Sequence, residues 1–559
     1  MVKKIFKIIH KEFGGLHEAA FLLGFSALIS QLLALFRDRL LAGTFGAGKI
    51  LDIYYTSFRI PDFVYVTIAS FVSITVLIPF LIERIETGNH RVAKEFMDSV
   101  FTAFCLIMIV VSGALFFIIP FLTKFIAPGF SSFEHQQLVT FTRILLFSPF
   151  LLGISNLLGS VTQSFRKFFV YALSPLLYNL GIIIGIVFFY PVLGPTGLVW
   201  GVVLGAMMHL LIQLPVITEH GFWPAFTSKI DYLSLKKIIA ISLPRTIALA
   251  SNQLSIIVLV SMASLMKSGS IAVFNFSYNL QSVPLAIVGV SYSVAAFPVL
   301  TRLFSQGEKE KYLSEISAAI RHIAFWSFIS GVLFIVLRAQ IVRVILGAGH
   351  FNWSDTRLTA ACLAIFAVSV VAQSLCQLFV RSYYAAGRTK TPLIINILSA
   401  LIVIVLAFVF HDLYLRFDGL RYGLEFLLRV DGLAGTSILI LPLAFSTGLI
   451  FNLIAHWFMF ERDFYKLPKG TLFSCFQSLS ASILGGVASY EVLNILEGWL
   501  NIRTFIGIFF QGFLAGLVGL TVFVLVLFLF GNRELKDIVH ALHSRFWKAR
   551  IAAPEQGTL

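Results

Sequence analysis

LIINILSALIVIVLAFVF, residues 393–410, and FIGIFFQGFLAGLVGLTVFVLVLFLF, residues 505–530, contain no charged side chain. Each stretch is long enough to cross the hydrocarbon core of a bilayer, about 30 Å thick, as an α-helix. Residues 100–122 and 176–192 are also uncharged. A transmembrane β-barrel would instead show short segments of alternating polarity. The sequence therefore predicts an all-α polytopic membrane protein.

The composition of the whole chain supports this class. Of 559 residues, 58% are hydrophobic and only 12% are charged, whereas about a quarter of the residues in a soluble domain are charged. Applied along the chain, the same hydrophobic pattern predicts about fourteen transmembrane helices. They are expected at residues 18–40, 57–83, 97–122, 137–162, 171–192, 195–217, 237–264, 274–303, 317–346, 356–383, 392–410, 433–458, 471–494 and 503–530.

The four cysteines give no indication of a disulfide framework or a metal site. All four lie in apolar segments, and none shows a CxxC or Cys/His ligand spacing. We therefore expect no bound metal, no cofactor and no catalytic role for these cysteines. The cysteines are Cys105, Cys362, Cys376 and Cys475.

The net charge of +15 is explained by membrane topology and does not indicate nucleic-acid binding. With the N-terminus inside, basic residues concentrate in alternate loops, while the opposite loops are poorer and residues 191–197 have no charge. This asymmetry follows the positive-inside rule and predicts a multi-pass protein with both termini in the cytoplasm. The basic loop residues include Arg84, Arg91, Lys94, Arg166, Lys167, Lys229, Lys236, Lys237, Arg302, Lys309, Lys311, Arg381, Arg388 and Lys390.

Two sequence patterns recur and indicate an internal duplication. SPLLYNL at residues 174–180 returns as TPLIINI at 391–397, and the helix containing Pro79 matches the helix containing Pro298. Pro175 and Pro392 are separated along the chain by nearly the same interval as Pro79 and Pro298. This agreement predicts two six-helix lobes that are related by an axis along the membrane normal. The expected parts are an amphipathic cytoplasmic N-terminus (1–17), an N-lobe (18–230), a C-lobe (231–460) with an interfacial insert (411–431), helices thirteen and fourteen (461–531) and a basic cytoplasmic tail (532–559).

The first helical hairpin contains an unusual concentration of charge. Arg37, Asp38, Asp52 and Arg59 lie within or next to its helices, and Arg245 lies in the seventh expected helix. Ionised groups at membrane depth are expensive and are therefore candidates for function. Arginine holds phosphate oxygens in a bidentate manner, so these residues are candidate substrate-binding residues. Snorkelling or local pairing of the arginines and helix capping by Asp52 remain as alternatives.

Three further residues have two possible roles each. Asn179 and its repeat counterpart Asn396 are expected to form helix-to-helix hydrogen bonds, with a substrate contact as the alternative. His209 stands alone in an apolar helix and is expected to be packed or hydrogen-bonded, with a proton relay as the alternative.

The residues SQLLALFRD (30–38), FGAG (45–48), Asp52 and RIPD (59–62) resemble the opening of the MurJ, or MviN, family of lipid II flippases. The resemblance covers nearly the whole chain. It implies the fold of the multidrug, oligosaccharidyl-lipid and polysaccharide exporter superfamily in the bacterial cytoplasmic membrane. It also implies transport of lipid II by alternating access for peptidoglycan and cell-wall biogenesis and for cell shape. Arg37 and Asp52 match positions important for flipping.

The resemblance also implies the partners of this protein, namely a lipid-linked oligosaccharide substrate, membrane lipids and a coupling ion. Gln31, Tyr65 and Asn279 stand where the family commonly has basic residues, so the resemblance does not fix which glycan the lipid substrate has. A flippase for another lipid-linked glycan, an exporter of the same superfamily and a non-transporting membrane scaffold are the alternative functions. A membrane enzyme is disfavoured, because no acidic pair or histidine cluster stands on a long polar loop.

Overall fold

The computed structural model describes residues 16–69, 74–86, 90–165, 167–468, 470–501 and 504–539. Over these residues the chain is helical and contains no β-strand, which confirms the expected fold class. Residues 1–15 of the predicted N-terminal segment 1–17 and residues 540–559 of the predicted basic tail 532–559 lie outside the described residues. Residues 533–539 of that tail form one further helical segment.

The chain divides into two compact units, of which the first comprises residues 1–277, 345–362 and 392–448. Its helices form because their apolar residues face lipid or neighbouring helices, as in other polytopic proteins. They are α2 (Leu16–Phe45), α3 (Lys49–Ser57), α4 (Arg59–Val64), η1 (Tyr65–Ala69), α5 (Ile74–Glu86), α6 (His90–Ile126), α7 (Ser132–Leu145), α8 (Phe147–Ser164), α9 (Phe168–Ile184), η2 (Gly185–Phe189), α10 (Tyr190–Leu193), α11 (Thr196–Leu211), α12 (Leu214–Glu219), α13 (Tyr232–Ser264), α21 (Asp418–Leu428) and η4 (Thr436–Leu439).

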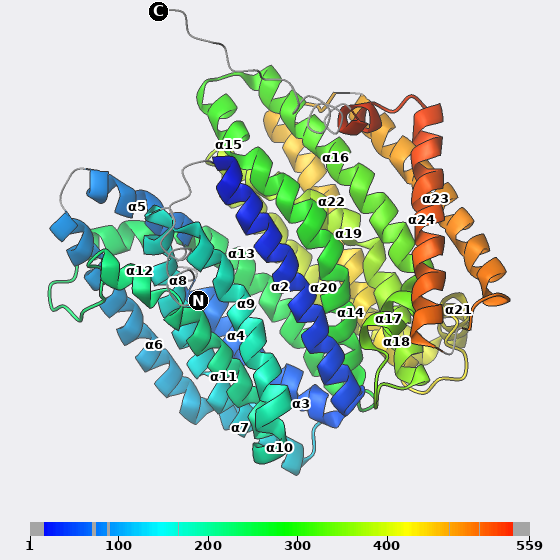
Figure 1. Ribbon diagram of the computed structural model, residues 1–559, viewed down its shortest axis with the longest axis horizontal. Helices are drawn as coiled ribbons and strands as arrows, with labels where there is room; N and C mark the ends of the chain where they lie inside the picture. Colours follow the sequence, from blue (N-terminus) through cyan, green and yellow to red (C-terminus); the bar gives the residue numbers. More distant parts are fainter. Residues whose placement is uncertain are drawn as a thin grey trace, which may run out of the picture. The chain divides into compact units, whose positions relative to one another are not determined.

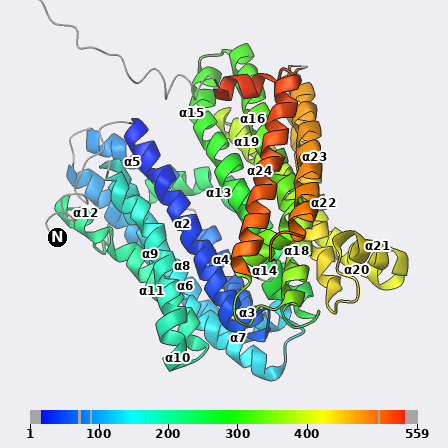
Figure 2. The same cartoon turned by 45° about the vertical axis from the view of Figure 1, so that its right-hand side comes forward.

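The second unit comprises residues 278–344, 363–391 and 449–559. In this unit α23 and α24 lie side by side (Figure 2). Its helices are η3 (Leu285–Val290), α15 (Ser291–Ser305), α16 (Lys309–Val336), α19 (Val370–Ala385), α23 (Gly470–Glu497) and α24 (Phe505–Leu529). Five helices contribute residues to both units, namely α14 (Ser270–Pro284), α17 (Arg338–Leu346), α18 (Trp353–Val368), α20 (Lys390–Arg416) and α22 (Ile440–Phe464).

Eleven stretches of the described chain are long and apolar enough to cross a membrane, or twelve if α18 and α19, bent by 42°, form one span. The expected count was about fourteen. Of the other two expected spans, residues 18–40 coincide with α2, and residues 57–83 include positions 70–73, which are not described. Each expected helix falls on an observed one, with ends displaced by several residues. The short helix α3 was not expected.

The helix boundaries support the predicted duplication. Helices α2 and α13 end at Phe45 and Ser264, and helices α6 and α16 begin at His90 and Lys309, so both pairs are separated by the same interval. The π-helical turns η1 and η3 repeat at almost the same interval and precede the helices with Pro79 and Pro298. Because π-turns are rare, their recurrence at one offset is independent of the sequence matches.

The interfacial insert predicted at residues 411–431 is only partly a separate helix. Residues 411–416 extend α20, and α21 follows with exposed Tyr422, Phe426 and Leu427. Its buried Glu425 accepts hydrogen bonds from the hydroxyls of Thr436 (2.6 Å) and Tyr414 (3.2 Å) and pairs with Arg421 at 3.1 Å. These bonds fix the insert to the end of α20 and to η4.

Close packing of α9 brings the elements of the charged hairpin together. A side chain on Gly205 of α11 would lie 2.4 Å from the carbonyl oxygen of Tyr178, and one on Gly201 would lie 2.4 Å from the Cα atom of Gly185. Only glycine allows this backbone approach. On its other side α9 packs along α2 (Figure 1). Helix α9 is thereby held between α11 and the helix that bears Arg37.

Candidate functional site

Arg37 lies on the face of α2 that meets α9. Its Nε and Nη2 atoms donate to Asp38 Oδ1 at 3.0 and 2.8 Å, and its Nη1 atom donates to Asn179 Oδ1 at 3.1 Å. The Arg37 side chain is 19% exposed, whereas the side chain of Asp38 is buried. The guanidinium is therefore neutralised by its neighbour in sequence and oriented by a residue 142 positions away.

Asn179 is the site residue that sequence reasoning did not assign to the site. Its Nδ2 atom donates to Ser30 Oγ at 3.3 Å and, within α9, to the carbonyl oxygen of Pro175 at 3.2 Å. Together with the bond that Oδ1 accepts from Arg37, its amide connects α9 to α2 at two points. The expected helix-to-helix hydrogen bond is thus confirmed. The repeated motif around Pro175 marked Asn179, but only the fold shows that its partner is Arg37.

The guanidinium of Arg37 keeps unused hydrogen-bonding capacity. An arginine has five N–H donors, and three of those of Arg37 are used by Asp38 and Asn179. The other two have no partner among the described residues. A half-buried arginine with two available donors is suited to bind an anionic oxygen in a charge-assisted way.

Asp52 lies in α3, where both of its carboxylate oxygens are occupied. Oδ2 accepts from the backbone N–H of Gly269 at 2.6 Å, and Oδ1 accepts from that of Ala272 at 2.9 Å. Gly269 directly precedes α14 and Ala272 lies in its first turn, where the N–H groups have no partners within the helix. Asp52 therefore caps a helix distant in sequence. Its predicted substrate-binding role stays a prediction.

Arg59 is buried at the start of α4. Its Nη2 atom donates to Oδ1 of Asn275, a residue of α14. Asp52 and Arg59 thus both connect the first hairpin to α14. Within the first unit, the structure brings Arg37 together with Asp38, and it attaches Asp52 and Arg59 to a common helix.

Two other arginines differ from this group. Arg245 is exposed on α13, in contrast to the buried or half-buried charged residues of the hairpin. Arg143 at the end of α7 donates from Nε to the carbonyl oxygen of Phe116 at 3.0 Å and lies 4.3 Å from that ring. Arg143 is therefore paired locally, with Phe116 of the same unit. Within the described chain, no group of three possible metal ligands occurs.

Comparison with known proteins identifies the family of this membrane protein. The family described as "Lipid II flippase MurJ" matches residues 41–510. The chain belongs to this family. The protein of Buchnera aphidicola subsp. Acyrthosiphon pisum (strain APS) called "Probable lipid II flippase MurJ" is 25% identical over 500 residues, which are 88% of this chain and 93% of that protein.

Other relatives and solved structures agree with this assignment. "Lipid II flippase MurJ" of Burkholderia cenocepacia is 24% identical over 379 residues, covering 66% of this chain and 73% of that protein. The structure "Lipid II flippase MurJ, inward closed conformation" has a TM-score of 0.72 at 20% identity and covers 93% of this chain and 100% of its own.

A multidrug resistance MATE family transporter of the MOP superfamily in an inward-facing conformation has a TM-score of 0.61 at 16% identity and covers 81% and 95% of the two chains. At such identities these structural likenesses establish the fold alone. The predicted family and fold class are both confirmed.

Proposed function

We propose that this protein moves lipid II, a polyprenyl-pyrophosphate-linked peptidoglycan precursor, across the bacterial cytoplasmic membrane by alternating access. Membership of the family and the names of the curated relatives support the substrate. The related MATE fold is known in both an inward-facing and an outward-facing conformation, which supports the mechanism. Flipping changes no covalent bond, so the protein acts as a transporter and not as an enzyme.

The arrangement around Arg37 is the observation that carries this proposal. A pyrophosphate must leave water to enter the protein, and it needs donors that are already oriented. Arg37 offers two N–H groups without a described partner, and Asn179 holds the third side of its guanidinium. Asp38 keeps the arginine in place while the site is empty, and the substrate oxygens then bind the remaining donors.

The other charged residues take supporting roles in the proposed cycle. Arg59 adds positive charge behind the site, and Asp52 fixes the hairpin to α14 in the conformation seen here. Arg245 is exposed on α13 and contacts the substrate from the seventh transmembrane helix. In this proposal the moving parts are the N-lobe (18–230) and the C-lobe (231–460), and both termini face the cytoplasm, as the basic loops favour.

A flippase for a different lipid-linked glycan is the second candidate function. It is favoured by Tyr65, which stands at a commonly basic position of the family and whose hydroxyl accepts a hydrogen bond from Asn156 at 2.9 Å. A site with fewer cations binds the pyrophosphate less strongly and depends more on contacts with the sugar. Both candidates share the pyrophosphate and the requirement for Arg37.

Flipping of lipid II in proteoliposomes tests the proposal. Arg37→Ala is expected to reduce transport at least tenfold, since a charge-assisted hydrogen bond contributes about 1.5–3 kcal/mol. Arg37→Lys keeps the charge but loses the planar fork, so partial activity is expected. Arg416→Ala removes an exposed arginine that pairs only with Asp412 in the described structure, and it serves as the control.

Membrane abundance of each variant is measured in parallel with transport. Full transport by Arg37→Ala would remove the pyrophosphate role of this residue. Transport of another lipid-linked glycan but not lipid II would favour the second candidate. A wild-type protein that transports neither lipid would favour the scaffold.

A further inference from the structure

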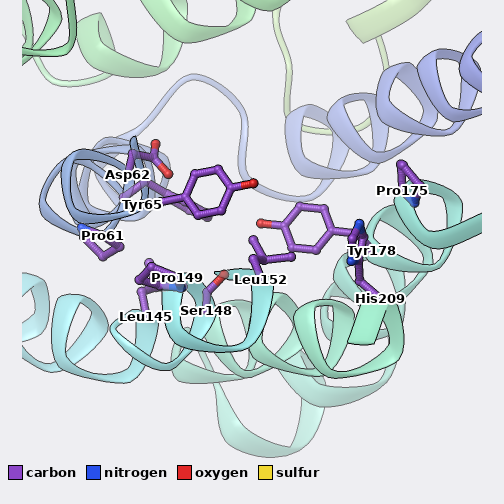
Figure 3. Close-up of a pocket in the computed structure, with 11 residues that line it drawn as sticks. Pro61, Asp62, Tyr65, Leu145, Ser148, Pro149, Leu152, Pro175, Tyr178 and His209 are labelled. Carbon is purple, nitrogen blue, oxygen red and sulfur yellow. The ribbon is translucent and has the colours of Figure 1, made fainter. Parts of the chain in front are cut away.

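A cavity of about 310 Å³ lies inside the first unit, between α4, α8, α9 and α11. Its polar lining consists of Asp62, Tyr65, Ser148, Tyr178 and His209, and its apolar lining is mainly proline and leucine. The phenol groups of Tyr65 and Tyr178 point toward each other in Figure 3. Its volume is at the lower end of the range of about 300–1,000 Å³ that is typical of small-molecule sites.

Two lining groups have unused hydrogen-bonding capacity. No hydrogen bond or ion pair reaches the Asp62 carboxylate from the described chain, and Arg59 acts on it only through its charge. The Nδ1 atom of His209 is hydrogen-bonded to the Ser155 hydroxyl at 2.7 Å, and that hydroxyl also lies 3.0 Å from the carbonyl oxygen of His209. The Nε2 atom of His209 therefore remains for a hydrogen bond with a ligand, as donor or acceptor according to the tautomer.

The chemistry of the lining excludes several ligand classes. None of the eleven lining residues is lysine or arginine, so a phosphate would meet the carboxylate of Asp62 without a compensating cation. A lipid chain would leave Asp62 and the Nε2 atom of His209 without hydrogen bonds, which is costly in a partly buried site. An organic ammonium ion would pair with Asp62, but it has no lone pair that could accept a hydrogen bond from the tyrosine hydroxyls.

A sugar ring satisfies all of these groups. Its hydroxyls donate to Asp62, form a hydrogen bond with Nε2 of His209 in either tautomer, and accept from the phenols of Tyr65 and Tyr178. Its C–H faces pack on the tyrosine rings. Apolar walls with a few oriented polar groups are the usual composition of a specific small-molecule site.

The cavity is also next to the proposed pyrophosphate site. Tyr178 lines the cavity, and the following residue, Asn179, binds Arg37 at 3.1 Å. Tyr178 lies within electrostatic range of both Arg37 and Asp62. We propose that this cavity is a sugar subsite, which holds the N-acetylhexosamine attached directly to the pyrophosphate while Arg37 holds the pyrophosphate itself. This inference rests on the proposed function and names a subsite for its substrate.

Binding of two lipids to the full-length protein in nanodiscs tests the subsite. One is a polyprenyl pyrophosphate without sugar, and the other is the same lipid with a single N-acetylhexosamine. The wild type is expected to bind the glycosylated lipid about tenfold more tightly, which equals about 1.4 kcal/mol. Asp62→Asn and Tyr178→Leu are expected to reduce this ratio to about one, with the affinity for the sugar-free lipid changed less than about twofold.

Tyr190→Leu is the matched control. Tyr190 belongs to α10 of the same unit and packs on Phe45, with ring centroids 4.8 Å apart, away from the cavity lining. The ratio should remain about tenfold in this variant. If Tyr178→Leu does not fold, Asp62→Asn preserves the side-chain shape and carries the test alone.

The results separate the subsite from the proposed function. Arg37-dependent binding of the sugar-free lipid, with no gain from the sugar, would overturn the subsite and leave the flippase proposal standing. A tenfold ratio that persists in Asp62→Asn and Tyr178→Leu would also overturn the subsite. Binding of neither lipid by the wild type would refute the proposed function and the subsite that rests on it.

Discussion

Replacement of Asp52 by asparagine is expected to loosen the first turn of α14. The Asp52 carboxylate is 5% exposed and accepts from the N–H groups of Gly269 and Ala272 at 2.6 and 2.9 Å. Asparagine keeps one acceptor oxygen but presents an NH₂ group to the other N–H donor. One charge-assisted bond is therefore lost, and one buried N–H group is left without an acceptor.

The size of the effect follows from these two bonds. Hydrogen bonds to charged groups contribute about 1.5–3 kcal/mol each, and an unsatisfied buried group costs about 1–3 kcal/mol. Because part of the site relaxes, we expect a net loss of about 2–3 kcal/mol. At about 1.4 kcal/mol per factor of ten, this loss equals a shift of about 30- to 150-fold in the opening of that turn.

Hydrogen–deuterium exchange of the full-length protein measures this opening. The amides of Gly269 and Ala272 are expected to exchange about 30- to 150-fold faster in Asp52→Asn, because local opening governs their exchange. Amides within α24 should be unaffected. Asp412→Asn, at an exposed carboxylate paired with Arg416, is the control. Unchanged exchange at residues 269–272 in a folded variant, or equal acceleration in every helix, would refute the capping role of Asp52.

Three further outcomes are expected. Gly205→Ala places a methyl group 2.4 Å from the Tyr178 carbonyl oxygen and should lower the thermal unfolding temperature, since overpacking costs about 1–3 kcal/mol. Gly113→Ala, with open space around residue 113, should leave the unfolding temperature unchanged. In the wild type the guanidinium of Arg321 pairs with the buried Glu534 at 2.6 Å, so Glu534→Ala removes its partner and should also lower the unfolding temperature. Asp537→Ala, at an exposed carboxylate, should have little effect. Burial raises the pKa of Glu425, but the hydrogen bonds from Thr436, Arg421 and Tyr414 outweigh it and hold the pKa below its usual range. The ionised Glu425 therefore stabilises the insert at pH values above the ordinary pKa of glutamate, and this stabilisation is lost as the pH falls through the lowered pKa. Proteolysis within residues 411–431 should accelerate at low pH in the wild type. In Glu425→Gln it should already be faster at neutral pH.

The hydrophobic sequence predicted the helices well because a membrane imposes one simple requirement on each span. Every backbone group must be satisfied within the segment, so length and apolarity locate it. Interruptions within spans are a different matter. The break between α7 and α8 at Leu146 follows from Pro149 in the first turn of α8, which has no N–H to donate to the carbonyl oxygen of Leu145, whereas the short helix α3 depends on packing against other helices.

The charged residues of the site were predictable as a group, but their partners were not. The cost of burying Arg37 and Asp38 is visible in sequence, since both lie in an apolar helix. The contact of Asp52 with Gly269 joins residues 217 positions apart, and that of Arg37 with Asn179 joins residues 142 apart. Such pairs follow from how the helices pack, and hydropathy carries no information about that.

The duplicated halves are not equivalent in chemistry. When α2 and α13 are aligned by their ends, Ile256 and Ile257 correspond to Arg37 and Asp38. Ile256 is buried and apolar. A charged pair inside a membrane protein is costly unless a ligand or partner uses it, so only the copy that binds an anion has a reason to keep one. The second copy keeps the proline positions and the π-turn without the charge. We therefore infer that duplication supplied the scaffold of both halves, while the charged pair of Arg37 and Asp38 is particular to the first half.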